Sequence, residues 1–307
     1  MSSGQKWAPV RPEYYVQVGG MHENPYGVPR DEIVRFILEN PPEVVAQVVF
    51  GRYVESSGLV FGSEIVQQMF DRSLERITGN FYIDRAAAER ARGERQRFGM
   101  YGSPFHTGVD FARQTDYTVI TTLDTIAKPA RVVYFKRLNR VPWEEIYTEV
   151  GKAVALWGPN VLCDSTGPGG DVSMDALESR FFCRVHARTV LIGHQCRGRP
   201  GDLEVCRPAD YISLSACEGF HFGAASKKEL VEHLRNVLSV GYNAIEPEQP
   251  FGWLRVPQIA QLEEEMAFYA WDDKRLQTDC LFSLALAAWS GLEDPVEDPL
   301  YGSVYGS

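Results

Sequence analysis

Three acidic residues lie where the surrounding sequence pattern favours apolar side chains. Asp110, the first of the three, interrupts the run "GVDFARQTDYTVITTL". Asp116, which is not one of the three, follows six residues later in the same run. Asp164 ends the run "NVLCD" just before "STGPGG", and Asp279 begins the last long apolar segment. A buried carboxylate without a partner is costly, so these positions point to a chemical role rather than to packing.

Carboxylates that gather at one place repel one another, and this repulsion raises their pKa values. In a sheet covered by helices, ligand groups collect at strand ends and at the adjoining helix starts. Divalent cations relieve the repulsion, and hard oxygen ligands suit Mg²⁺ or Mn²⁺. Two such ions about 4 Å apart activate a water and stabilise a leaving oxygen in phosphodiester cleavage, so we expect Asp110, Asp164 and Asp279 within roughly 8 Å of one another.

Each acid also has a plainer interpretation. Asp279 is typical of the first turn of a helix, where the dipole favours a negative charge. Asp164 and Asp116 suit turns, which accommodate aspartate well. Asp110 is the hardest to explain in this way, because valine precedes it and phenylalanine follows it. The three acids in this order along the chain indicate a metal site more specifically than any one of them does alone.

The elements that would position these acids form an α/β pattern. Three strand-like runs between residues 105 and 139 are separated by short polar gaps, which favours antiparallel hairpins. A helix after Pro142, a strand before Asp164, a helix and the strand "FFCRVHA" then follow, so we expect a mixed sheet flanked by helices. The segment "SKKELVEHLRNVLSVG" and the apolar run from Asp279 predict further helices.

The sequence before residue 100 differs in character from the rest of the chain. It reads as short helices and then as an Ala/Arg-rich stretch with few large apolar residues, which indicates a linker or an exposed helix. We therefore expect a small helical segment at 1–77, a linker at 78–101, the α/β domain at 102–292 and a flexible tail at 293–307.

The net charge of −10 argues against a protein that coats nucleic acid by bulk charge, although a local basic groove remains compatible with it. The stretch between Glu178 and Asp202 holds five arginines and no acid. We interpret Arg184, Arg188, Arg197 and Arg199 as candidate phosphate contacts, with a solvated hairpin as the equal alternative. Lys274, near Asp279 in the sequence, is a further candidate.

The six cysteines include no CxxC pair, which indicates reduced thiols in a cytosolic protein. Cys183 and His186 followed by His194 and Cys196 could ligate zinc, but their spacing fits zinc knuckles poorly, so we favour ordinary strand and loop residues.

The N-terminus lacks a signal-peptide pattern, and no run of about 18 apolar residues occurs, so no membrane association is expected.

Two motifs, "GVDFARQTDYTV" and "DSTGPGG", also suit the phosphate loops of actin-like ATPases. Those folds contain the module twice, and this chain has one copy.

Four motifs of this chain together resemble the nuclease domain of the large terminase subunit of tailed phages. They are "GVDFARQTDYTVI", "VLCDSTGPGGDV", "SKKELVEHLRNVL" and "QTDCLFSLALAAW". The resemblance covers 102–292, and the stretch from His22 to Phe61 resembles the end of the terminase motor domain.

This resemblance implies an RNase H-like fold with metal-binding acids at Asp110, Asp164 and Asp279 and an accessory acid at Asp116. It implies an endonuclease that uses two Mg²⁺ or Mn²⁺ ions to cut concatemeric double-stranded DNA during viral genome packaging. The implied partners are the small terminase subunit, the portal protein and a motor ATPase domain or chain, and the implied location is the host cytoplasm, transiently at the procapsid portal. The rival interpretations are another RNase H-like nuclease, of junction-resolvase or integrase type, and an inactive docking module between motor and portal.

No G-x-x-x-x-G-K-[ST] motif occurs in this sequence, so the phosphate-cradling loop of a motor is absent from it. We therefore expect no ATP hydrolysis by this chain alone.

Overall fold

The computed structural model describes residues 27–39, 45, 49, 59–71, 76–82, 104–112, 117–125, 129–196, 206–239, 254–271 and 277–293. The chain divides into two compact units, Met1–Gly62 and Ser63–Ser307. The first unit contains helix α1 (Arg30–Glu39), whose first turn carries Asp31 and Glu32, acids that favour a helix start. No helix among the described residues combines the length and apolar character that a membrane crossing requires.

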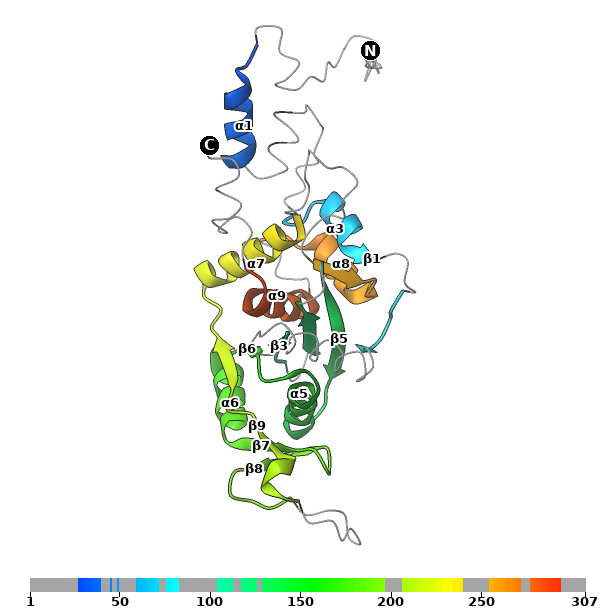
Figure 1. Cartoon of the computed structure of the whole chain (residues 1–307), viewed down its shortest axis with the longest axis vertical. Coiled ribbons are helices and arrows are strands. Elements are labelled where there is room, and N and C mark those ends of the chain that lie inside the picture. The colour runs from blue at the N-terminus through cyan, green and yellow to red at the C-terminus, as the bar shows by residue number, and fades with distance from the viewer. Residues whose placement is uncertain are drawn as a thin grey trace, which may run out of the picture. The chain divides into compact units, whose positions relative to one another are not determined.

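The larger unit is built on a mixed sheet, as predicted (Figure 1). Three long antiparallel strands lie at its centre: β3 (Phe105–Asp110), β4 (Tyr117–Asp124) and β5 (Ala130–Asn139). On the far side of β3, strand β6 (Val161–Asp164) runs parallel to it, and β10 (Cys217–Phe220) runs parallel to β6. The order β5-β4-β3-β6-β10, with three antiparallel strands followed by parallel ones, is RNase H-like.

Further strands extend the sheet beyond β5. Strand β11 (Leu254–Pro257) runs parallel to β5, and β1 (Phe70–Asp71) runs parallel to β11. The short strand β2 (Phe81–Tyr82) pairs with β5 in the antiparallel sense.

The N-terminal boundary of the sheet unit lies earlier than the sequence pattern indicated. Helix α3 (Ser63–Met69) ends where β1 begins, and Phe70 pairs with Val256 of β11. Residues 63–71 and 77 therefore belong to the sheet unit and not to the expected helical segment, and β2 lies inside the expected linker. These pairings join residues far apart in the sequence, which local periodicity does not reveal. Residues 83–101 and 294–307, the rest of the expected linker and most of the tail, lie outside the described residues.

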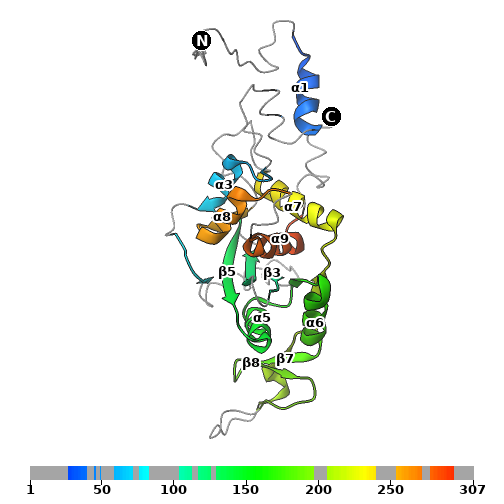
Figure 2. The ribbon, with the colours of Figure 1, turned by 180° about the vertical axis from the view of Figure 1, so that it is seen from behind.

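Helices cover both faces of the central strands (Figures 1 and 2). Helix α5 (Trp143–Trp157) packs on one face, where Phe105 contacts Trp157 with a ring-centroid distance of 4.9 Å. Helix α9 (Asp279–Gly291) packs on the other face, against β3, β4 and β6. Helix α6 (Gly167–Glu178) follows β6, while α7 (Ala224–Ser239) and α8 (Ala260–Phe268) pack against α9.

The strand "FFCRVHA", expected in the mixed sheet, instead belongs to a second, small sheet. This sheet has the order β8-β7-β9, from β7 (Arg180–Cys183), β8 (Arg188–Leu191) and β9 (Tyr211–Ser213), all antiparallel. It packs on α5, where a Cβ atom at Gly151 would lie 2.5 Å from the ring of Phe182. The hydroxyls of Thr148 and Thr189, 3.2 Å apart, join the same two elements.

Helix α9 approaches β3 so closely that only glycine fits at position 108. A Cβ atom there would lie 2.0 Å from the Ser283 carbonyl oxygen and 2.5 Å from the Ala287 backbone nitrogen. The Ser283 hydroxyl donates to the Gly108 carbonyl oxygen at 3.0 Å and lies 2.8 Å from the Thr121 hydroxyl. The helix is thus held against two strands by packing and by hydrogen bonds.

We predict that Gly108→Ala lowers the free energy of unfolding by about 3 kcal/mol or more, because overpacking typically costs 1–3 kcal/mol and here the obstructing atoms are backbone. The control is Gly169→Ala in α6, where an added Cβ meets nothing within 4 Å. Urea unfolding followed by circular dichroism measures both variants. Equal midpoints for Gly108→Ala and wild type would show that α9 does not lie this close to β3.

Candidate metal-binding acidic site

Asp110 and Asp164 end two neighbouring parallel strands. The register pairs Gly108 with Leu162 and Val109 with Cys163, so the next residue on each strand is an aspartate. Adjacent strands lie about 4.8 Å apart, and residues at equivalent positions point to the same face. The register therefore puts Asp110 and Asp164 at equivalent positions at the same edge of the sheet.

Asp279 is brought to this edge by the direction of α9. His106 of β3 contacts the C-terminal end of the helix, with His106 Nδ1 2.9 Å from the Ser290 hydroxyl. Gly108, two residues later, contacts Ser283, which lies earlier on the helix. The helix thus runs antiparallel to β3, and residues 106, 108 and 110 share the strand face that it covers. The next turn toward the helix start carries Asp279, so the helix direction takes it toward the end of β3 that carries Asp110.

A hydrogen bond fixes the Asp279 carboxylate at the start of β4. The Tyr117 backbone N–H donates to Asp279 Oδ2 at 3.1 Å. Tyr117 lies two residues before Val119, which pairs with Asp110 across the β3–β4 ladder. Both acids are largely buried, with 9% of Asp110 and 8% of Asp279 exposed. Sheet and helix therefore hold both acids in a confined space.

The turn after Asp164 is rigid. The Thr166 N–H donates to Asp164 Oδ1 at 2.7 Å, and the Phe222 N–H donates to the Thr166 hydroxyl at 2.8 Å. A Cβ atom at Gly170 would lie 2.3 Å from the Ser165 carbonyl carbon, so this glycine lets α6 start directly behind the strand. The glycine-rich stretch after Asp164 forms the first turn of α6.

Burial raises the pKa of the Asp164 carboxyl, although hydrogen bonds from Thr166 and the positive charges of His221 and Lys227 oppose the rise. Burial therefore makes the ionised form of Asp164 less favourable than it is in water, and nearby positive charge opposes this effect. A divalent cation would supply that charge.

Sequence reasoning missed a fourth acid, Glu265 of α8. It is 4% exposed, and its Oε2 accepts a hydrogen bond from the Leu281 N–H at 2.8 Å, in the first turn of α9. Burial raises the pKa of Glu265 to about 7, and the nearby Asp279 carboxylate adds to the rise. Glu265 belongs to the run "EEE" at residues 263–265, which in the sequence is typical of a solvated helix face.

Two basic side chains flank the acids. The Arg137 guanidinium lies 3.4 Å from the ring centroid of Tyr117, whose backbone holds Asp279. Its charge lowers the pKa of Glu265 in opposition to burial. On the other side, Lys227 of α7 lies near Asp164 and 4.6 Å over the ring of Phe282. Neither residue stood out in the sequence, because isolated basic residues in a strand and a helix carry no local signal.

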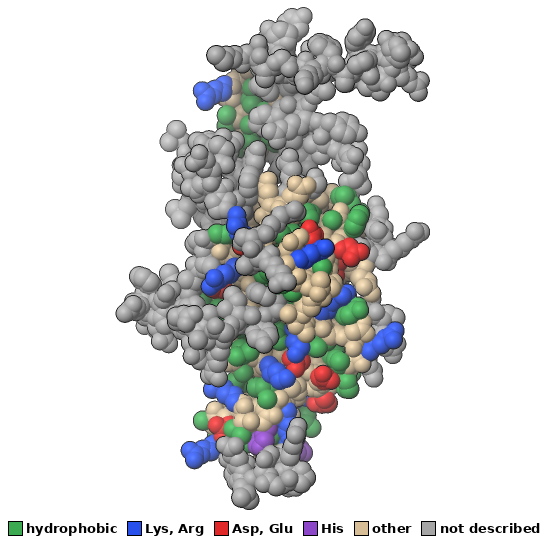
Figure 3. Space-filling view, turned by 90° about the vertical axis from the view of Figure 1, so that its right-hand side faces the viewer, with side chains coloured by type: hydrophobic (Ala, Val, Ile, Leu, Met, Phe, Trp, Pro, Cys, Tyr) green, Lys and Arg blue, Asp and Glu red, His purple; other side chains and the backbone are tan. Residues whose placement is uncertain are grey.

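The remaining candidates have different outcomes. Asp116, Arg197, Arg199 and Lys274 lie outside the described residues. Arg184 and Arg188 are exposed on the β7–β8 hairpin, and Arg188 Nε donates to the Cys196 sulfur at 3.2 Å. Figure 3 shows basic side chains interspersed with acidic ones along one face, rather than one uniformly basic area. Their contact with a phosphate backbone stays a prediction.

Among the described residues, the group of ligand atoms that lie close enough together to hold a metal ion does not include Asp110, Asp164 or Asp279. Cys183, His186, Cys196 and Cys206 each place one ligand atom within 4.8 Å of the other three. The four groups lie closer together than their spacing in the sequence indicated. His194, which the sequence suggested as a ligand, is not a member, and Cys206, which it did not suggest, is.

The acidic edge fits a hard divalent cation by the chemistry of its donors. Asp110, Asp164 and Asp279 offer carboxylate oxygens, the ligands that Mg²⁺ and Mn²⁺ prefer, and Glu265 lies behind them. A cation bound there would lower the free energy of the ionised forms, which burial makes less favourable for Asp164 and Glu265.

No protein-family model matches the sequence, and no curated protein matches it. Solved structures do resemble the chain. The large terminase nuclease from thermophilic phage G20c with bound magnesium is 15% identical, with a TM-score of 0.44 over 76% of this chain and 97% of that chain. The large terminase nuclease domain of Thermus phage P74-26 is 14% identical, with a TM-score of 0.41 over 73% and 92%. Structural similarity at these TM-scores carries no argument about function. The function proposed below therefore depends on the residues of this chain.

We predict that Mn²⁺ raises the melting temperature of the wild-type protein and that Asp110→Asn removes most of this rise. Saturating ligand at about 100 times its dissociation constant contributes about 2.7 kcal/mol. Without added metal, Asp110→Asn should melt at or slightly above the wild-type temperature, because one repelling charge is gone. Differential scanning calorimetry with and without Mn²⁺ measures both effects.

The matched control is Asp175→Asn, which changes an exposed acid on α6 and should leave the Mn²⁺ response intact. An Asp110→Asn protein that melts well below wild type without metal, yet keeps the full Mn²⁺ response, would show that Asp110 is a structural acid.

Proposed function

We propose that this chain is a metal-dependent DNA endonuclease that cuts concatemeric double-stranded DNA as part of a viral packaging terminase. The observation that supports the proposal is the register of β3 and β6, which puts Asp110 and Asp164 at equivalent positions of neighbouring parallel strands, together with the hydrogen bond that holds Asp279 at the start of β4. The assignment to a terminase depends in addition on the four sequence motifs that resemble the terminase nuclease domain, which follow one another along this chain in the same order.

The protein's own contribution to the reaction is positioning. When bound, two Mg²⁺ or Mn²⁺ ions would supply an activated water and stabilise the leaving oxygen. Asp110 and Asp164 would hold these ions from strands whose backbone is fixed by the sheet, and Asp279 from a helix fixed against β3. Asp116 would be an accessory acid beside them.

Lys227 and Arg137 would bind the phosphates on either side of the cut. Both lie close to the acids, and each rests against an aromatic ring that restricts its position. A fixed positive charge stabilises the charge that develops on a phosphate in the transition state. Arg184, Arg188, Arg197, Arg199 and Lys274 would add contacts to the DNA backbone further away, and these would weaken as salt increases.

The partners and location that we propose follow from the same assignment. They are the small terminase subunit, the portal protein and a motor ATPase, with action in the host cytoplasm at the procapsid portal. Sequence specificity would come from these partners, because contacts to phosphates carry no base information. This chain alone would not hydrolyse ATP.

We predict that wild-type protein with Mn²⁺ converts supercoiled plasmid to nicked and linear forms. Asp110→Asn, Asp164→Asn and Asp279→Asn should each slow this conversion by at least about 100-fold, since each removes a charged oxygen ligand from the ion that activates the water. Lys227→Ala should slow it by about 10- to 100-fold, and its neighbour Lys228, which pairs with Glu232 at 3.5 Å, provides the control variant Lys228→Ala. Agarose gels of a time course give the rates.

Wild-type cutting rates in a well-folded Asp110→Asn protein would contradict the proposal. Wild-type protein that cuts no DNA with either ion would support the docking alternative instead. Strong preference for a four-way junction over linear duplex would assign the same acids to a junction resolvase.

A further inference from the structure

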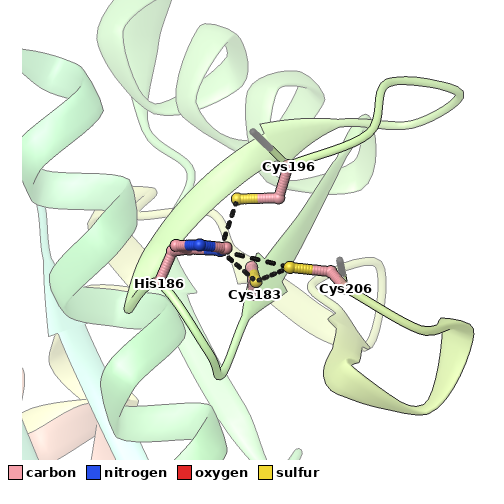
Figure 4. Close-up of side chains that lie close together, drawn as sticks. All are labelled: Cys183, His186, Cys196 and Cys206. Atoms are coloured by element: carbon pink, nitrogen blue, oxygen red, sulfur yellow. Dashed lines mark hydrogen bonds between the residues drawn. The ribbon is translucent and has the colours of Figure 1, made fainter. Parts of the chain in front are cut away.

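Four potential ligand atoms meet at the end of the small β8-β7-β9 sheet, away from the acidic site (Figure 4). Cys183 ends β7, and His186 lies in the tight turn between β7 and β8. Cys196 follows β8, and Cys206 precedes the short 3-10 turn that leads into β9. Four side chains from three backbone segments thus point to one centre.

These ligand atoms lie about as close together as those that share a tetrahedral zinc ion, and all of them are within 4.8 Å of one another. His186 Nδ1 lies 3.1 Å from the Cys206 sulfur, 3.4 Å from the Cys196 sulfur and 3.7 Å from the Cys183 sulfur. The Cys183 and Cys206 sulfurs are 3.4 Å apart. With metal–sulfur distances of about 2.3 Å and metal–nitrogen distances of about 2.0–2.1 Å, tetrahedral ligand atoms lie roughly 3.5–3.8 Å from one another.

A disulfide does not explain the arrangement. A sulfur–sulfur bond is about 2.05 Å long, much shorter than the 3.4 Å between Cys183 and Cys206, and all six cysteines are free. A disulfide would also engage two of the four groups and leave a third thiol and the imidazole beside it. A cation that binds soft sulfur and nitrogen ligands satisfies all four at once.

Neighbouring residues hold one of the ligands in place. Arg188 Nε donates a hydrogen bond to the Cys196 sulfur at 3.2 Å. The Tyr211 hydroxyl accepts a hydrogen bond from the Cys196 N–H at 2.9 Å, which fixes the backbone that carries this ligand. Such outer contacts orient metal ligands in known sites.

The small sheet also lacks a large core of its own. Strand β9 has no fully buried residue, and β8 is half-buried or exposed throughout. A bound metal contributes folding free energy directly where apolar burial is small. Four protein ligands fill a tetrahedral shell and leave no position for a substrate, so such an ion has a structural role.

We propose that Cys183, His186, Cys196 and Cys206 bind a structural Zn²⁺ ion that joins the β7–β8 turn to the segments that follow β8 and precede β9. The ion holds the hairpin that presents Arg184, which lies between two ligands in the sequence. It is separate from the oxygen-ligand site at Asp110, and the two differ in the metals they prefer.

The test begins with protein expressed in zinc-supplemented medium and purified under reducing conditions with a weak chelator. Mass spectrometry of the metal content should give about one zinc per wild-type chain, since four ligands hold one ion. Cys206→Ser and His186→Ala should lose the zinc, whereas the matched controls Cys217→Ser and His194→Ala should keep it. A double variant Asp110→Asn/Asp164→Asn should also keep it, which separates this site from the acidic one.

Cobalt(II) substitution tests the ligand type. Wild-type protein should show the thiolate charge-transfer and intense visible bands of tetrahedral cobalt, and Cys206→Ser should lose them. His186→Cys, which offers four thiolates, should restore one zinc per chain even if His186→Ala folds poorly. Wild-type protein that binds no zinc, or zinc that Cys206→Ser, His186→Ala and the controls all retain, would overturn the proposal, as would a Cys183–Cys206 disulfide in the reduced preparation.

Discussion

The contact between Gly108 and the Ser283 turn of α9 determines the geometry of the proposed active site. Since a Cβ atom at position 108 would lie 2.0 Å from a backbone oxygen, the helix and strand meet at van der Waals distance with nothing between them. The Ser283 hydroxyl then bonds to the Gly108 carbonyl and lies against Thr121, which ties the helix to two strands. The position of the first turn of α9, which carries Asp279, follows from this contact.

Burial makes the ionised forms of two acids in this unit less favourable than they are in water. The pKa values of Asp164 and Glu265 are both raised, mainly for this reason. The charge of Lys227 opposes the rise at Asp164, and that of Arg137 opposes it at Glu265. A site of this kind is expected to gain stability from a hard cation, which links the binding of metal to the rigidity of the edge.

The sequence predicted those features whose signal is local. Asp110 and Asp164 stand out because each breaks an apolar strand pattern, and the order of strands and helices predicts the mixed sheet. Glu265 could not be found, because its burial results from the packing of α8 on α9 and its neighbours are also glutamates. Cys206 was missed because nine residues, rich in glycine and arginine, separate it from Cys196, and nothing local indicates that the chain returns there. The edge strands β1 and β2 depend on pairings with distant segments and so had no local signal either.

The most direct test of the acidic site is a crystal structure of the protein soaked in Mn²⁺, with anomalous diffraction recorded on both sides of the manganese absorption edge. We expect an anomalous peak, or two about 4 Å apart, in contact with the carboxylates of Asp110, Asp164 and Asp279. A well-ordered crystal in which these carboxylates point away from one another and the manganese peaks lie elsewhere would contradict the proposed metal site.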